Sequence, residues 1–192
     1  MITNQPQIFE SGLTGAGPAM WYGSDVPDGD RIPWATAPIG SMYCRKTTTS
    51  VQWYQKRKAD SADNDWALTW GEIRQTVTRA EFTDGGAAVG TLVLDEQIPA
   101  GAWVLRSLVR DVTAFAGNTS AAMTIGDGTD ADRYMVASTL DVFSTVAMLD
   151  GGAPSGTQIH TAAKSVTLTI TSAADFTAVS GGALTISIYY LG

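Results

Sequence analysis

The chain has 192 residues, of which 44% are hydrophobic and 16% charged, and its net charge is −7. Such a length suits one domain with an appendage or two small domains. The acidic balance argues against a nucleic-acid partner, because phosphate binding needs clustered Lys and Arg. A single cysteine leaves no internal disulfide, and the lack of 18 consecutive apolar residues argues against a membrane span.

Residues 1–36 are predicted to form an extended N-terminal arm. Five of the seven prolines fall before residue 39, with glycines between them, and these residues interrupt helices and strands. The first residues lack the basic and apolar regions of a signal peptide, so we expect a protein made in the cytoplasm. Large apolar side chains in the arm indicate that it lies against its own domain or against a neighbouring subunit.

Residues 37–71 are predicted to form a small β-hairpin module. Its strands are expected near 41–46 and 51–58, joined by a turn at Thr47–Ser50, with a third short strand at 66–70. Aromatic residues concentrate in the first 70 positions, which indicates a seam between subunits or, as an alternative, a carbohydrate-stacking surface. The predicted interface residues are Ile8, Phe9, Met20, Trp21, Tyr22, Trp34 and Trp53.

Residues 72–192 are predicted to form an antiparallel β-sandwich of the jelly-roll kind. Gly, Thr, Ser and Ala are abundant there, and strands such as Val166–Thr171 alternate apolar and hydroxyl side chains. Glycine-rich turns separate the segments, and no helical crossover is indicated. The expected strands are 76–83, 89–95, 102–115, 120–126, 134–144, 157–161, 164–171 and 182–191.

The residues that most often carry chemistry have no evident partners in the sequence. His160 is the single histidine, and we expect it to be an ordinary strand or surface residue. Cys44 is expected to be a half-buried strand thiol, since its basic sequence neighbours point to the opposite face. No catalytic residue and no cofactor or metal site is therefore predicted, and we expect a protein that is not an enzyme.

The acidic loop after residue 126 is the one candidate for an ion site. Asp127, Asp130 and Asp132 supply hard oxygen ligands, but their order departs from the calcium-loop pattern. The favoured interpretation is a turn that uses Asp and Gly for their backbone tolerance. Calcium binding is left open.

Two segments resemble structural proteins on the particles of tailed bacteriophages. The stretch Ile98–Tyr134 reads IPAGA, a strand, TAFAGNTS, a second strand, TIG and an acidic loop, an order that is similar to segments of those proteins. The hairpin module resembles one in phage fibre and head-fibre proteins, but Arg45 stands where an acidic residue is usual and the turn lacks its glycine.

The resemblance implies a capsid decoration, or cement, protein on the outer capsid surface of the virion. Its implied partners are the major capsid protein and further copies of itself, as a homotrimer. The alternative that it implies is a head-fibre or tail-fibre protein that recognises host-surface glycans. The sequence contains neither heptads nor β-helical repeats, which argues against a long fibre.

Overall fold

The computed structural model describes residues 7–9, 20–23, 37–58, 66–117, 119–136, 139–155 and 159–192. Within these ranges the regular structure is β-strand, apart from two short 3-10 turns, η2 (Arg79–Glu81) and η3 (Phe176–Ala178). The all-β prediction is therefore confirmed. Over the same ranges, no helix has the length and apolar character that a membrane crossing requires.

The chain forms two compact units. One comprises Met1–Glu72 with Leu191–Gly192, and the other comprises Ile73–Tyr190. One long strand, β5 (Trp66–Thr78), contributes residues to both units. The predicted division into an arm (1–36), a hairpin module (37–71) and a sandwich (72–192) stays a prediction.

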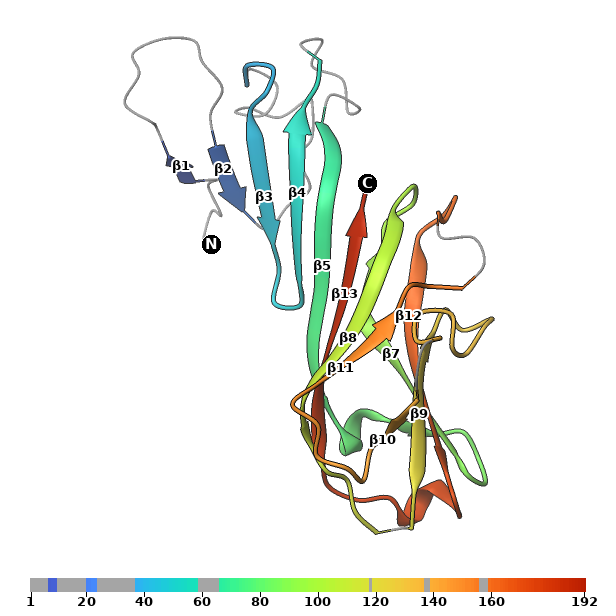
Figure 1. The fold of residues 1–192 in the computed structure, drawn as a ribbon. Helices are drawn as coiled ribbons and strands as arrows, with labels where there is room; N and C mark the ends of the chain where they lie inside the picture. Colours follow the sequence, from blue (N-terminus) through green and yellow to red (C-terminus); the bar gives the residue numbers. More distant parts are fainter. Residues whose placement is uncertain are drawn as a thin grey trace. The chain divides into compact units, whose positions relative to one another are not determined.

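The first unit is built on a sheet with the strand order β1-β2-β3-β4-β5 (Figure 1). Strand β2 pairs in parallel with β3, whereas β1 with β2 and β3 with β4 are antiparallel. The predicted hairpin turn is present, and the Ser50 N–H donates to the Thr47 hydroxyl at 2.9 Å. The strands are β1 (Gln7–Phe9), β2 (Met20–Gly23), β3 (Met42–Lys46), β4 (Ser50–Lys56) and the first part of β5.

Strand β2 corrects the expectation that the arm has no strand pattern. Met20 and Tyr22 are exposed while Trp21 between them is buried, which is the period-two alternation of a strand with one buried face. Trp21 packs against Trp66, with ring centroids 5.9 Å apart, and Trp66 packs against Tyr43 at 6.3 Å. These three aromatic side chains form the core of the first unit.

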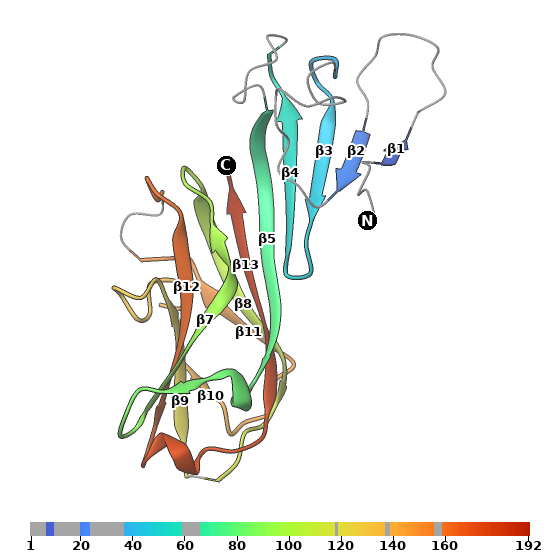
Figure 2. The same cartoon turned by 180° about the vertical axis from the view of Figure 1, so that it is seen from behind.

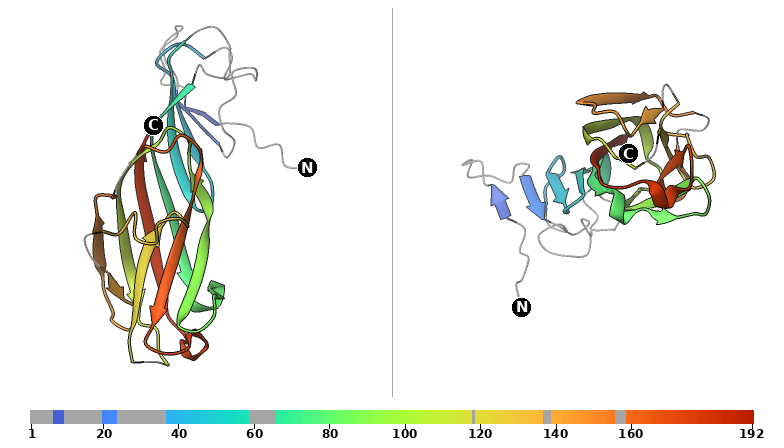
Figure 3. Two further views of the ribbon diagram at one scale, coloured as in Figure 1. Left: turned by 90° about the vertical axis from the view of Figure 1, so that its right-hand side faces the viewer. Right: turned by 90° about the horizontal axis from the view of Figure 1, so that it is seen from below.

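The second unit is an antiparallel β-sandwich (Figures 2 and 3). One sheet has the order β5-β13-β8-β11 and the other the order β10-β9-β12-β7-β6. Apolar residues of β12 alternate inward, and Leu168 lies opposite Leu92 on one side and Ile125 on the other. The strands are β6 (Thr83–Asp84), β7 (Val89–Ile98), β8 (Trp103–Thr113), β9 (Ala121–Gly126), β10 (Leu140–Asp141), β11 (Met148–Gly152), β12 (Lys164–Ser172) and β13 (Ala183–Leu191).

Several strand predictions differ from the structure. Strand β5 continues through the break expected at 71–75, and the 3-10 turn η2 replaces part of the strand expected over 76–83. Of the strand expected over 134–144, residues 137 and 138 lie outside the described residues, the described part that forms a strand is β10, and the Met135 N–H donates to the Asp132 carbonyl in a turn. Strand β11 was not predicted, since its two glycines are poor strand formers. Of the strand expected over 157–161, residues 157 and 158 lie outside the described residues, and Ile159 forms an isolated bridge with Trp103.

One end of the sandwich is closed by three phenylalanines and an arginine. Phe82 lies 6.4 Å from both Phe115 and Phe176, measured between ring centroids. The Arg79 guanidinium stacks 4.1 Å from the centre of the Phe176 ring, and its Nε donates to the Val179 carbonyl at 2.7 Å. Glycine is required at position 90, because a Cβ there would overlap the Phe176 ring.

Candidate functional site

The structure separates the predicted interface residues into several environments. Met20 and Tyr22 are 47% and 42% exposed, whereas Trp21 is 5% exposed and belongs to the core of its own chain. Trp53 is half-buried in β4. Ile8 and Phe9 lie in β1, opposite Trp21 and Met20, but their side chains are outside the described residues, as is Trp34. Trp21 therefore packs within its own chain, and its predicted place in an interface stays a prediction.

The strand register brings the exposed members of this set onto one face of the first sheet. Tyr22 in β2 lies opposite Cys44 in β3, and Cys44 lies opposite Trp53 in β4. Trp53 stacks on Trp70 of β5, with ring centroids 6.1 Å apart and planes inclined by 24°. Directly paired residues share a face of a sheet, so these side chains form one row across four strands.

We call this surface the open face. It consists of the row together with the neighbouring residues on the same side of the sheet. Trp70 is 41% exposed and was absent from the predicted interface set, although it follows the hairpin on the next strand. Apolar aromatic surface left in water is a common mark of a binding surface. The members of the open face are Met20, Tyr22, Met42, Cys44, Lys46, Val51, Trp53, Gln55 and Trp70.

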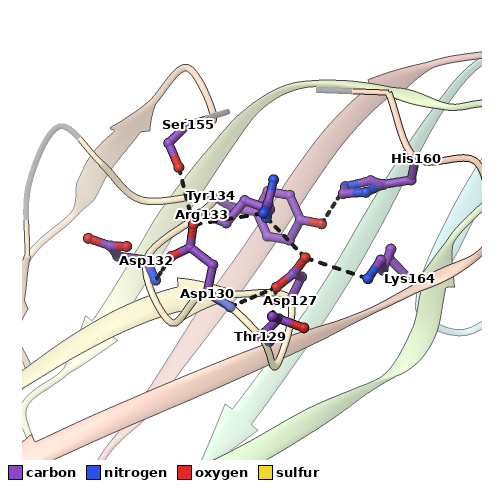
Figure 4. Close-up of polar contacts among 9 residues, drawn as sticks. All are labelled: Asp127, Thr129, Asp130, Asp132, Arg133, Tyr134, Ser155, His160 and Lys164. Atoms are coloured by element: carbon purple, nitrogen blue, oxygen red, sulfur yellow. Dashed lines mark hydrogen bonds and ion pairs between the residues drawn. The ribbon is translucent and has the colours of Figure 1, made fainter. Parts of the chain in front are cut away.

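The acidic loop is a turn closed by its own carboxylates (Figure 4). The Asp127 carboxylate accepts backbone N–H groups from Thr129 at 3.0 Å and Asp130 at 2.9 Å. Its other oxygen lies 3.0 Å from Arg133 Nε and 3.8 Å from Lys164 Nζ. The favoured turn interpretation agrees with this geometry, because the Asp127 side chain serves backbone donors and cations of the same chain.

The pKa of Asp127 reflects a balance of opposing effects. Burial of the carboxyl is the largest of them and by itself raises the pKa. The two backbone donors and the positive charges of Arg133 and Lys164 together outweigh burial, so the pKa lies below its ordinary value. A carboxylate that stays ionised and paired in this way stabilises the turn between β9 and the segment that follows it.

His160 differs from the strand or surface residue that we expected. It is 6% exposed, and its Nε2 lies 2.7 Å from the hydroxyl of Tyr134, which is fully buried (Figure 4). Burial lowers the pKa of His160, and the nearby positive charge of Arg133 lowers it further. Burial likewise raises the pKa of Tyr134. The pair is thus a neutral, hydrogen-bonded contact inside the sandwich.

Cys44 lies in β3 and is half-buried, as the sequence predicted. Burial raises the pKa of its thiol, although Lys46 acts in the opposite direction. A raised pKa leaves the thiol protonated near neutral pH, which does not favour a nucleophile. Over the described ranges, no three His, Cys, Asp or Glu side chains come together as they would around a metal ion.

Comparisons with protein families, curated proteins and solved structures identify no function for the open face or the acidic loop. No protein-family profile matches the chain, and no curated protein matches it. A solved structure described as the cyanophage Pam1 capsid asymmetric unit contains a similar chain, with 18% identity and a TM-score of 0.35. The similarity covers 64% of this chain and 81% of that chain. A TM-score of this size carries no argument about function.

Proposed function

We propose that this protein is a non-enzymatic structural component of a tailed-bacteriophage particle, where it decorates and stabilises the capsid as a cement protein. Two observations support the proposal. The segment Ile98–Tyr134 and the hairpin module resemble phage structural proteins. The second unit is an antiparallel β-sandwich, and its strand order supports our proposal that it is a jelly roll, an architecture of viral capsid and lectin domains.

The strand order carries the proposal. Over the residues that the structure describes, and setting aside the short β6, the second unit has eight strands in chain order, from β5 and β7 to β13. Three antiparallel pairs join these strands from the outside of the order inward. The second strand, β7, pairs with the seventh, β12. The third, β8, pairs with the sixth, β11, and the fourth, β9, pairs with the fifth, β10. The first and eighth strands, β5 and β13, are neighbours in the sheet that also contains β8 and β11. A hairpin strip wound into two Greek keys produces this pairing.

The proposed partners are the major capsid protein and further copies of this chain, as a homotrimer on the outer capsid surface. A trimer matches the threefold symmetry elements of a closed shell, and each copy would present the same contacts to the lattice. The proposal requires no cofactor.

Immunogold labelling of intact particles of the encoding phage tests this function. Label distributed evenly over the head, at many copies per particle, is the expected result. Capsids that lack the protein should also disrupt at a lower temperature than complete capsids, and added protein should restore the difference. Absence of label from the head would overturn the cement proposal.

The second candidate function is a head-fibre or tail-fibre protein that recognises host-surface glycans. The observation that favours it is the open face, whose exposed aromatic side chains have no role in the sandwich. Label confined to the tail tip in the same experiment would support this candidate over the first.

A further inference from the structure

We propose that the contact between His160 and Tyr134 is a proton-sensitive switch, which holds three connecting segments of the second unit together when His160 is neutral and releases them when His160 is protonated. The switch is a property of the second unit itself and goes beyond the proposed capsid role. It rests on the hydrogen bonds of one buried imidazole and on the charges that face it.

His160 joins three segments that connect strands. It belongs to the segment before β12, and its backbone pairs with the turn between β7 and β8. Its carbonyl accepts the Gly101 N–H at 2.7 Å, and its N–H donates to the Ala102 carbonyl at 3.4 Å. Its side chain reaches the segment after β9, where Nε2 lies 2.7 Å from the Tyr134 hydroxyl (Figure 4). The three segments therefore meet at one residue.

Tyr134 holds its hydroxyl in a fixed position. Its side chain is fully buried, and its N–H donates to the Ile125 carbonyl at 2.9 Å. Its own carbonyl accepts the hydroxyl of Ser107 from β8. Because both backbone groups and the ring are held, the phenol oxygen cannot move to a new partner while this part of the sandwich stays closed.

Protonation of the imidazole reverses the hydrogen bond between the two side chains. In neutral His160 with its proton on Nδ1, Nε2 accepts the phenol O–H, and this tautomer satisfies the buried hydroxyl. The imidazolium has a proton on both nitrogens and can only donate. Over the part of the chain that the structure describes, the Tyr134 hydroxyl has no other hydrogen-bond partner than His160. Protonation therefore leaves the phenol proton buried without an acceptor, which is unfavourable.

The charges that face His160 add to this cost. Arg133 and Lys164 disfavour the imidazolium, whereas Asp127 favours it. Asp127 already pairs with both cations, at 3.0 Å from Arg133 and 3.8 Å from Lys164. Burial is the largest effect and acts in the same direction as the cations, so the pKa of His160 lies below its ordinary value. In an opened, hydrated form the pKa returns to about 6.5, and acid therefore favours opening.

Opening at this contact is local. The hydrogen bonds that His160 makes lie outside the strand ladders, and their loss leaves β12 paired with β7 and β9, and β8 paired with β11. Local opening of connecting segments requires less free energy than unfolding of a whole domain. We therefore expect the three segments to separate from one another while the two sheets remain formed.

NMR titration of the full chain tests the protonation. His160 is the single histidine, so one imidazole signal reports its midpoint. We expect this midpoint below about pH 6.5. Lys164→Gln removes a repelling cation and should raise the midpoint, whereas Lys46→Gln is matched in charge but lies on β3 of the first unit, and should leave it unchanged. A midpoint at or above about pH 6.5 in the unmodified chain would overturn the proposal.

Hydrogen exchange of single amides, about one pH unit above and below this midpoint, tests the opening. After correction for the intrinsic effect of pH on exchange, protection of the Gly101 and Tyr134 amides should fall at least about twofold on the acid side. Low urea concentrations should leave this exchange unchanged but accelerate exchange of the Leu168 amide, which requires global unfolding.

His160→Gln is the matched variant, because its amide oxygen can still accept the Tyr134 O–H and does not titrate. It should lose the acid-dependent exchange, and circular dichroism should show that all variants are folded. Two results would contradict the switch. One is an equal fall in protection in His160→Gln. The other is the same urea dependence for Tyr134 and Leu168, which would mean that the segments separate only when the whole unit unfolds.

Discussion

At the scale of single residues, the side chain of Trp21 has a different environment from its two neighbours in β2. Met20 and Tyr22 point to water, whereas Trp21 contacts Trp66 and lies on the strand next to Tyr43. The hydrophobicity of an aromatic residue in a proline-rich segment predicts burial but not which surface buries it. That choice depends on the parallel pairing of β2 with β3, between residues that are 22 positions apart.

Trp21→Ala should destabilise the first unit by about 3–5 kcal/mol, because it removes a large ring from a packed core and leaves a cavity. Trp70→Ala is the comparison, since that ring is 41% exposed and its loss should cost far less. Urea denaturation followed by circular dichroism measures both. Similar costs for the two variants would show that Trp21 is not a core residue.

His160 makes the stability of the second unit dependent on pH. Its pKa lies below the ordinary value of about 6.5 because burial, foremost, disfavours the imidazolium. The unfolded chain therefore binds a proton at higher pH than the folded chain. The stabilisation that depends on neutral His160 is fully present above pH 6.5 and is lost as the pH falls toward the lower, folded-state pKa.

We expect the melting temperature to fall as the pH is lowered below about 6.5. In His160→Gln, which cannot titrate, this part of the fall should be smaller. Differential scanning calorimetry across this range measures the difference. An identical pH dependence in the two proteins would assign the acid sensitivity to other groups.

At the scale of elements, some strand glycines lie where another side chain packs against the backbone. The alternation of apolar and polar residues in the sequence does not predict such contacts. Gly90 in β7 lies beneath the Phe176 ring of η3, and the two residues are far apart in the sequence. Strand β11 ends in two glycines and pairs with β8 nevertheless, because its backbone completes the sheet. Local propensity therefore failed at β11, where tertiary pairing determined the strand.

Gly90→Ala should cost about 1–3 kcal/mol, because its methyl group would overlap the Phe176 ring. Phe176→Leu leaves more space beside position 90, so the double variant should lose less stability than the two single variants combined. Equilibrium unfolding of the three variants provides this cycle. Strictly additive losses would show that the two side chains do not meet.

At the scale of the whole molecule, the proposed capsid role requires a defined assembly. A homotrimer should have a mass of about three times the 20.2 kDa of one chain, or about 61 kDa, in light scattering coupled to size exclusion. The measurement is made on the full chain at several concentrations. A monomeric mass at every concentration would remove the homotrimer from the proposal. The copies would then be arranged symmetrically only through their binding to the capsid lattice.

The sequence by itself determined the all-β class, the hairpin at Thr47–Ser50 and most strands of the sandwich, because alternation and turn residues are local properties. Met20, Tyr22 and Trp53 were also identified as candidate surface residues from their hydrophobicity. Their participation in an interface stays a prediction.

The tertiary structure alone decided which side chains meet. It placed Lys164 beside Asp127, His160 against Tyr134, and Trp70 beside Trp53. Each contact joins residues that are distant in the chain, so it depends on strand order and register rather than on local pattern. The same register separated Trp21 from the exposed row and thereby defined the open face.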